Sequence, residues 1–155
     1  MKKTYLYLGK EYPLEIRVGQ KNVIELSDKF YLGIPNINRA EFYLESWYKQ
    51  QARKLIIERV YLYAKRYGLN FNSVEVGRVA ATTRWGSCSS DKNLHFNWKL
   101  IMAPIEAIDY VVAHELSHLT ELNHSKLFWE NVRKMFPLYR SSRTWLRRNG
   151  HLLNL

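Results

Sequence analysis

Three histidines and one glutamate between residues 114 and 124 have the types and spacing of a catalytic metal centre. His114 and His118 are four residues apart, so on an α-helix they lie one turn apart on the same face and can converge on one ion. Glu115 lies on the adjacent face, too far round to be the obvious third ligand but within reach of a water on the metal. This H-E-x-x-H pattern predicts a zinc site in which the glutamate is the general base.

The third protein ligand should come from beyond this helix, because a catalytic zinc keeps three protein ligands and an open fourth position. His124, six residues after His118, is well placed for that role. Glu121 and Glu130 are competing candidates, although both are more typical of solvated surface carboxylates. We expect one zinc ion per chain, bound by His114, His118 and His124.

The helix that carries these residues is indicated by its apolar spacing. Apolar side chains recur along it at steps of three and four residues: Ile105, Ile108, Val112, Leu116 and Leu119. Pro104 suits the first turn, and Asn123 can adopt a left-handed conformation that ends the helix. Ser125 is then the expected N-cap of a second helix.

Length and composition favour a folded protein of the cytoplasm. The chain has 155 residues, of which 46% are hydrophobic, enough for a real core. Its one cysteine, Cys88, excludes an internal disulfide and fits a reducing compartment. No apolar run approaches the length of a membrane span, so we expect no membrane partner.

The net charge of +10 is concentrated at the C-terminal end. Residues 126–155 hold seven lysines and arginines against one acidic residue, and we expect a basic helix over 137–155. Its arginine cluster consists of Arg140, Arg143, Arg147 and Arg148. Such a stripe could follow the phosphates of a nucleic acid, or it could be a solvated face that keeps the protein soluble.

The remaining pattern predicts short strands and one long helix. Four strands are expected early in the chain, at 5–8, 14–18, 23–26 and 30–32. A long amphipathic helix over 39–67 should end at Gly68. Strands at 74–83 and 94–100 should form a β-hairpin around a turn at 89–93. This order is typical of an α+β fold.

A resemblance to a known family rests on four segments. They are 84–88 (RWGSC), 97–104 (NWKLIMAP), 109–118 (DYVVAHELSH) and 123–125 (NHS) with the nearby Phe128 and Trp129. Through them the chain resembles the YgjP-like zinc metallopeptidases, relatives of the SprT-like proteases within the zincins. The resemblance covers residues 80–136 with high specificity and the first 70 residues mainly in layout.

The resemblance implies a zincin-like α+β domain over residues 1–155. Its parts would be a β-rich segment (1–36) with a small antiparallel sheet, a long helix (38–68), a catalytic core (74–136) and a basic C-terminal helix (137–155). It also implies His114, His118 and His124 as zinc ligands and Glu115 as catalytic base. The family brings no defined substrate.

The implied chemistry is hydrolysis of peptide bonds in a protein or peptide substrate. Arg84 and Tyr110 are candidates for contacts to the substrate or to the oxyanion of the transition state. Arg84 could equally form a structural ion pair. The strand at 78–85 could be the edge along which an extended peptide pairs.

Two other enzyme classes remain as alternatives. Metal-dependent endoribonucleases of the ribosomal-RNA maturation type share the H-x3-H-x5-H spacing, but they resemble H-G-x-x-H at the position of Glu115. Deformylase-like amidohydrolases pair H-E-x-x-H with a cysteine ligand, for which Cys88 is the candidate. The metzincins share the same spacing too, but they place glycine where this chain has Glu121.

Overall fold

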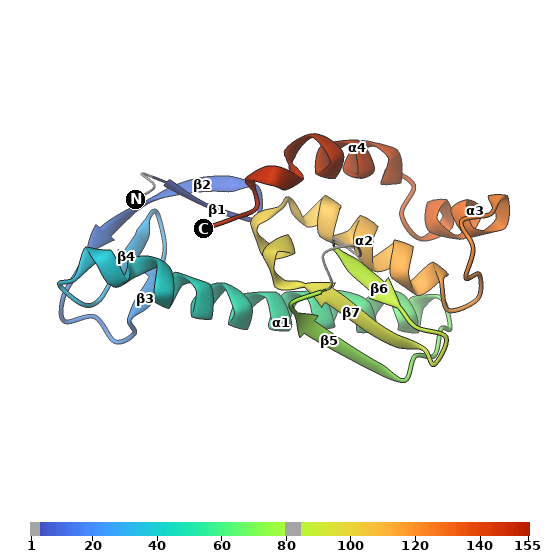
Figure 1. Ribbon diagram of the computed structural model, residues 1–155, viewed down its shortest axis with the longest axis horizontal. Coiled ribbons are helices and arrows are strands. Elements are labelled where there is room, and N and C mark those ends of the chain that lie inside the picture. Colours follow the sequence, from blue (N-terminus) through green and yellow to red (C-terminus); the bar gives the residue numbers. More distant parts are fainter. Residues whose placement is uncertain (1–3, 80–84) are drawn as a thin grey trace.

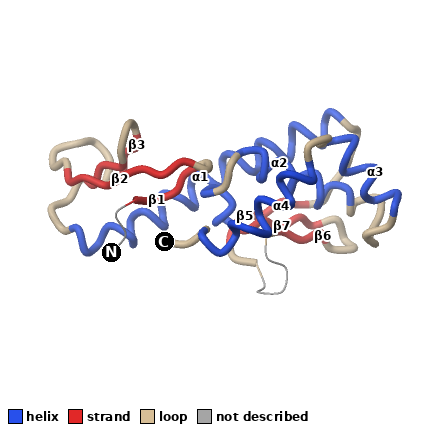
Figure 2. The backbone as a smooth tube through the Cα atoms, turned by 90° about the horizontal axis from the view of Figure 1, so that it is seen from above, coloured by secondary structure: helices blue, strands red, loops and turns tan. Residues whose placement is uncertain are grey.

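One long helix, α1 (Ala40–Arg66), runs along the molecule and joins two groups of strands, as Figure 1 shows. The computed structural model describes residues 4–79 and 85–155. A four-stranded sheet lies at the N-terminal end of α1. A three-stranded sheet and helices α2 (Ile105–Ser117), α3 (Lys126–Met135) and α4 (Tyr139–Asn149) lie at its C-terminal end, an arrangement also visible from above in Figure 2.

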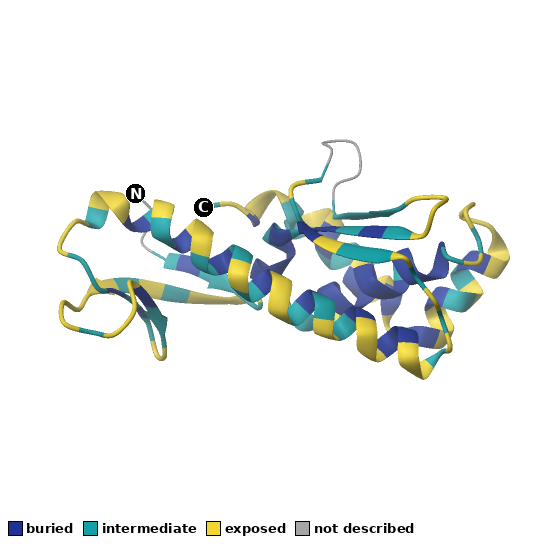
Figure 3. Cartoon of the chain, turned by 90° about the horizontal axis from the view of Figure 1, so that it is seen from below, coloured by how far each residue is buried: buried dark blue, intermediate teal, exposed yellow. Residues whose placement is uncertain are grey.

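The spacing of buried residues explains how α1 serves both ends. Its fully buried residues follow at steps of four: Ala40, Leu44, Tyr48, Ala52, Ile56 and Val60. Each such step advances about 40° round the helix, so the buried stripe turns through roughly 200° along these residues. The helix therefore packs on different elements at its two ends, while its other surface stays exposed (Figure 3). Gly68, with a φ of +64°, follows the end of α1 as the sequence predicts.

The N-terminal sheet has the order β1-β2-β4-β3. Its strands are β1 (Thr4–Tyr7), β2 (Lys10–Ile16), β3 (Ile24–Leu26) and β4 (Phe30–Leu32). All four expected strands are present, although β2 begins four residues early and pairs with β4 in parallel. Phe30 and Leu32 are fully buried, and the Tyr48 hydroxyl of α1 donates a hydrogen bond of 2.5 Å to the carbonyl of Leu6. The sheet is thereby fixed to α1.

The second sheet corrects the expected β-hairpin. Its strands are β5 (Ser73–Gly77), β6 (Gly86–Cys88) and β7 (Asn93–Asn97), in the order β5-β7-β6. β5 and β7 pair in parallel, so the prediction that they form a hairpin is wrong, and β6 is the antiparallel partner of β7. β7 ends before residue 100 because the Asn97 side chain accepts a hydrogen bond from the Lys99 amide and starts a 3-10 turn. The end of the strand expected at 74–83 lies outside the described residues.

Helix α2 is the centre of the C-terminal half and contacts α1, α3, α4 and β6. Its buried Asp109 accepts two hydrogen bonds from Arg59 of α1, from Nε at 2.7 Å and from Nη2 at 2.6 Å. This bidentate pair fixes α2 against α1. The α+β class predicted from the sequence is confirmed, but the small sheet expected to be antiparallel is mixed, because β2 and β4 pair in parallel, and the second sheet is mixed as well. In the two described segments, no helix has the length and apolar character needed to cross a bilayer.

Candidate metal centre and pocket

The three histidines predicted from the spacing come together in space. One ring nitrogen from each of His114, His118 and His124 lies within 4.8 Å of the others. Among the residues that the structure describes, no other group of three or more His, Cys, Asp or Glu side chains could hold a metal ion. Imidazole nitrogens suit zinc and several other transition metals, so both the donor type and the spacing fit a single ion.

The position of His118 depends on a turn rather than on the helix. α2 ends at Ser117, and the Nδ1–H of His118 donates a hydrogen bond of 2.9 Å to the carbonyl of Glu121. This bond orients the ring and leaves Nε2 free for a metal, an arrangement common for metal-binding histidines. Glu121 therefore contributes its backbone, and its carboxylate is outside the cluster.

The way the chain reaches His124 also differs from the expectation. Asn123 is not left-handed, because Leu8 and Lys92 are the non-glycine residues with positive φ within 4–79 and 85–155. The helix ends earlier, and residues 118–123 form the turn that returns His124 to the cluster. Partial desolvation lowers the pKa of His124, and the neighbouring His114 and His118 lower it further. Both effects favour the neutral imidazole that binds metals.

Phe128 of α3 packs against the rings of all three histidines. It is fully buried, and its ring centroid lies 4.4 Å from that of His118, 4.9 Å from that of His124 and 5.0 Å from that of His114. α3 begins as predicted at Ser125, whose side chain accepts a hydrogen bond from the Phe128 amide at 3.3 Å. The helix start thus fixes the residue on which the histidines pack.

Glu115 lies beside the cluster without belonging to it. It is 4% exposed, and its Oε2 lies 3.0 Å from Nδ1 of His114. β6 passes close to it, since a Cβ added at Gly86 would lie 3.0 Å from Glu115 Cγ. Sequence reasoning gave Gly86 no role. Its only signal was a glycine within the 84–88 segment.

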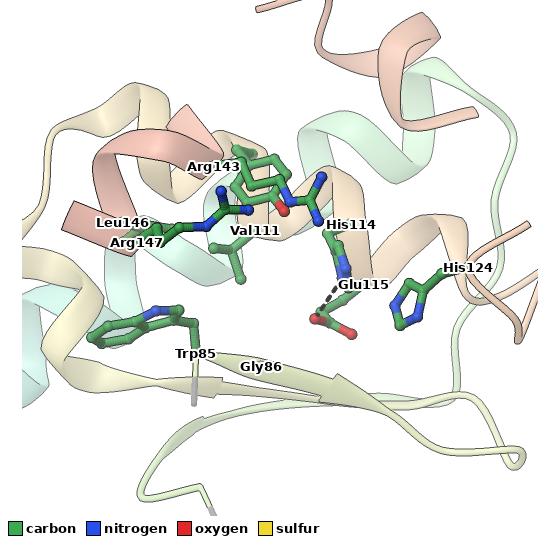
Figure 4. Close-up of a pocket in the computed structure, with 10 residues that line it drawn as sticks. Trp85, Gly86, Val111, His114, Glu115, His124, Arg143, Leu146 and Arg147 are labelled. Atoms are coloured by element: carbon green, nitrogen blue, oxygen red, sulfur yellow. Dashed lines mark hydrogen bonds and ion pairs between the residues drawn. The ribbon is translucent and has the colours of Figure 1, made fainter. Parts of the chain in front are cut away.

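A pocket of about 370 Å³ opens beside the metal centre. It is lined by Trp85, Gly86, Tyr110, Val111, His114, Glu115, His124, Arg143, Leu146 and Arg147 (Figure 4). Tyr110, predicted as a substrate contact, is among them, and burial with the nearby Glu115 charge raises its pKa to about 12 against the opposing effect of Arg143. Arg84, the other predicted contact, lies outside the described residues.

The four basic residues predicted as one nucleic-acid surface are divided by the structure. Arg143 and Arg147 line the pocket beside the metal centre. Arg140 lines a second pocket, of about 460 Å³, to which Arg143 also contributes. Arg148 lines neither of them. Sequence reasoning identified the stripe but missed its position at the site.

Cys88 is a free, half-buried residue of β6 and is outside the metal cluster. Burial raises the pKa of its thiol to about 11, and the charge of Glu115 adds to this effect. A high pKa disfavours the thiolate that a metal ligand requires. The arrangement therefore offers no support for the cysteine ligand of a deformylase-like site.

Comparison with known proteins identifies a family and a similar solved structure. The family described as YgjP-like, metallopeptidase domain, matches residues 1–149. No curated protein matches the sequence. Among solved structures, the crystal structure of the metallopeptidase zymogen of Pyrococcus abyssi abylysin is similar, with a TM-score of 0.52 and 21% identity over 63% of this chain and 94% of that chain. At this identity the likeness concerns the fold alone.

Proposed function

The chain belongs to the YgjP-like metallopeptidase family, and from this premise we propose that it is a zinc enzyme that uses Glu115 as its general base. The observation that carries the proposal is the convergence of three histidine nitrogens within 4.8 Å beside a buried carboxylate, at the wall of an open pocket. Three histidine ligands leave a fourth position for water and substrate, which is typical of catalytic rather than structural zinc.

Glu115 provides the proton transfers of the proposed reaction. When bound, the zinc ion would polarise the scissile carbonyl and lower the pKa of the attacking water toward neutrality. Glu115 accepts a proton from that water and donates it to the leaving amine. Its position supports this role, because the carboxylate is packed between α2 and the backbone of β6 and lines the pocket with two of the histidines.

Tyr110 and β6 supply the proposed substrate contacts. Tyr110 keeps its proton at neutral pH and lines the pocket, so its hydroxyl can donate a hydrogen bond to the developing oxyanion. β6 is an edge strand of its sheet and lies next to Glu115, so an extended peptide could pair with it in place of the expected 78–85 edge. Arg84 stays a candidate for the same oxyanion contact.

The substrate, cellular compartment and partners of the enzyme are also proposed. Its substrate is a protein or peptide, and a chain with one free cysteine suits the reducing cytoplasm. Weak nucleic-acid binding through α4 stays a hypothesis, which the binding of a single-stranded oligonucleotide tests. The endoribonuclease alternative does not account for the buried Glu115, because those enzymes resemble H-G-x-x-H and have glycine at this position.

Replacing Glu115 by Gln tests the general base. Glu115→Gln keeps the shape but cannot accept a proton, so we expect one zinc per chain and a loss of casein hydrolysis of at least about 10²-fold. Glu106→Gln, an exposed position in the first turn of the same helix, is the matched control and should retain activity. Cleavage at the wild-type rate by Glu115→Gln, or Glu115-dependent cleavage of RNA in place of protein, would contradict the proposal.

The ligand set is tested by metal analysis of two further variants. His124→Ala should lose zinc to a chelator far more readily than the wild type. Glu121→Ala should keep it, because His118 is held by the Glu121 backbone carbonyl. The opposite result would make Glu121 the third ligand.

A further inference from the structure

We infer that the α4 side of the pocket is a binding subsite for a carboxylate of the substrate, formed by Arg143 and Arg147. This inference rests on the proposed peptidase function. The two arginines are four residues apart on α4, so they lie on one face of that helix. Figure 4 shows both side chains extending from α4 into the pocket, above the strand that carries Gly86.

Within residues 4–79 and 85–155, no acidic side chain pairs with the guanidinium group of Arg143 or of Arg147. α4 itself contains no acidic residue, and Glu115 is the one carboxylate among the described residues that line the pocket. Two like charges one turn apart disfavour the helix unless something compensates them. An anion bound in the pocket would provide that compensation.

The guanidinium of Arg143 is held in position by an aromatic stack. Its Cζ lies 4.7 Å from the centroid of the Trp129 ring. Trp129 in turn stacks on Tyr139 at 5.5 Å and on the proposed metal ligand His124 at 6.1 Å. Such cation–π packing fixes the orientation of the planar donor group before a ligand arrives.

The helix behind these arginines is anchored as well. The Ser142 hydroxyl donates a hydrogen bond of 3.1 Å to the carbonyl of Glu106, and Leu146 is buried. At the end of α4, a Cβ added at Gly150 would lie 2.8 Å from Cζ2 of Trp85, so the indole packs directly on the backbone there. The α4 side of the pocket, which carries Arg143 and Arg147 and is called the wall from here on, is therefore a fixed part of the site.

The chemistry of the wall selects its ligand. Guanidinium groups bind carboxylates and phosphates with paired hydrogen bonds. The second pocket, which shares Arg143, adds Lys126, Arg133 and Arg140 and a single acid, Glu130. Because the wall adjoins the proposed centre for peptide hydrolysis, its ligand should be a peptide carboxylate close to the scissile bond. This carboxylate could be an Asp or Glu side chain or the C-terminus of the substrate.

Direct binding to the zinc-loaded Glu115→Gln protein tests the subsite without any turnover. Three fluorescent peptides of one sequence are compared by anisotropy: one with Asp and an amidated end, one with Asn and an amidated end, and one with Asn and a free carboxylate. We expect at least one carboxylate peptide to bind roughly tenfold more tightly than the neutral one. The peptide that gains shows whether the side chain or the C-terminus is recognised.

Arginine variants in the same background assign the preference to the wall. The double variant, Arg143→Gln with Arg147→Gln, should abolish the preference for the carboxylate peptide over the neutral one. Arg148→Gln removes a charge from the same helix outside both pockets and should preserve this preference. Equal binding of the three peptides, including the absence of binding by all, would overturn the inference. So would an equal loss in Arg148→Gln.

A cleavage experiment separates this inference from the proposed function. Wild-type cleavage without any charge preference would overturn the subsite and leave the peptidase intact. Selective binding without cleavage of any peptide would overturn the peptidase and leave the subsite. A single-stranded oligonucleotide that binds more tightly than the acidic peptides, and does so through Arg143 and Arg147, would make the wall a nucleic-acid site and overturn the inference.

Discussion

Gly86 controls where the carboxylate of Glu115 can lie. A Cβ at residue 86 would lie 3.0 Å from Glu115 Cγ and 3.1 Å from the carbonyl of His95, so either the glutamate or the strand must move. The strand cannot give way easily, because β6 pairs with β7 at this point. The absence of a side chain at residue 86 is therefore part of the site.

We expect Gly86→Ala to lower kcat roughly tenfold, because a small displacement of a reacting group is costly. Zinc content should stay at the wild-type value, since no metal ligand is displaced. Gly77→Ala is the matched control in the same sheet, because nothing lies within 4 Å of a Cβ added there. Steady-state kinetics and metal analysis of both variants check this prediction, and a full rate for Gly86→Ala would contradict it.

Whether a contact in the site could be predicted from the sequence depends on how far apart the two residues are along the chain. The spacing of His114, His118 and His124 was sufficient to predict their convergence, because a helix and a short turn connect them. The contacts of Gly86 and Arg143 were not predictable in the same way. They depend on β6 and α4, which are separated by about fifty residues of chain and meet at the pocket only in the folded protein, so no local pattern encodes these contacts.

At the scale of elements, the N-cap of α3 connects helix formation with the metal centre. Ser125 accepts a hydrogen bond from the amide of Phe128, and Phe128 packs on all three histidines. A weaker start of α3 would therefore reach the ligands through one buried ring.

We expect Ser125→Ala to reduce the free energy of unfolding by about 1 kcal/mol, the usual cost of losing a helix cap. Zinc should also dissociate faster, because the Phe128 ring would be less well held. Ser125→Asp restores a capping oxygen and should recover both properties. Urea unfolding with chelator competition measures them, and an unchanged Ser125→Ala protein would show that the cap contributes nothing.

Elements with strong periodicity were predicted well, and pairings were not. The sequence predicts a helix over 39–67 and the structure has α1 at Ala40–Arg66, because a long stripe of apolar residues defines it. The parallel pairing of β5 with β7 was missed, since alternation shows that a strand has two faces but not which strand lies beside it. The end of β7 was missed because the Asn97 side chain caps a 3-10 turn within an alternating run.

At the scale of the whole molecule, α1 couples the N-terminal sheet to the C-terminal half, which has α2 at its centre. Tyr48 bonds the carbonyl of Leu6 at one end, and Arg59 pairs with Asp109 of α2 at the other. Loss of structure around Tyr48 should therefore reach α2, and the two halves should unfold together.

Alkaline pH provides a test of this coupling. Burial raises the pKa of Tyr5 to about 12, helped by the neighbouring Glu41, and burial likewise raises the pKa of Tyr48. Unfolded tyrosines titrate near pH 10, so above this pH the unfolded chain releases protons that the folded protein retains. The stability contribution of these tyrosines is complete below about pH 10 and is lost as the pH rises toward 12. Urea unfolding at stepped pH should show this decline, and probes of the tyrosines and of the metal centre should report the same transition.

The Tyr48→Phe variant should be less stable than the wild type at neutral pH by about 1 kcal/mol, because the hydrogen bond of Tyr48 is lost. Above pH 10, its stability should decline less steeply than that of the wild type. Tyr61→Phe, at a position 59% exposed, is the control and should follow the wild-type curve. Parallel curves for Tyr48→Phe and wild type would show that alkaline unfolding begins elsewhere.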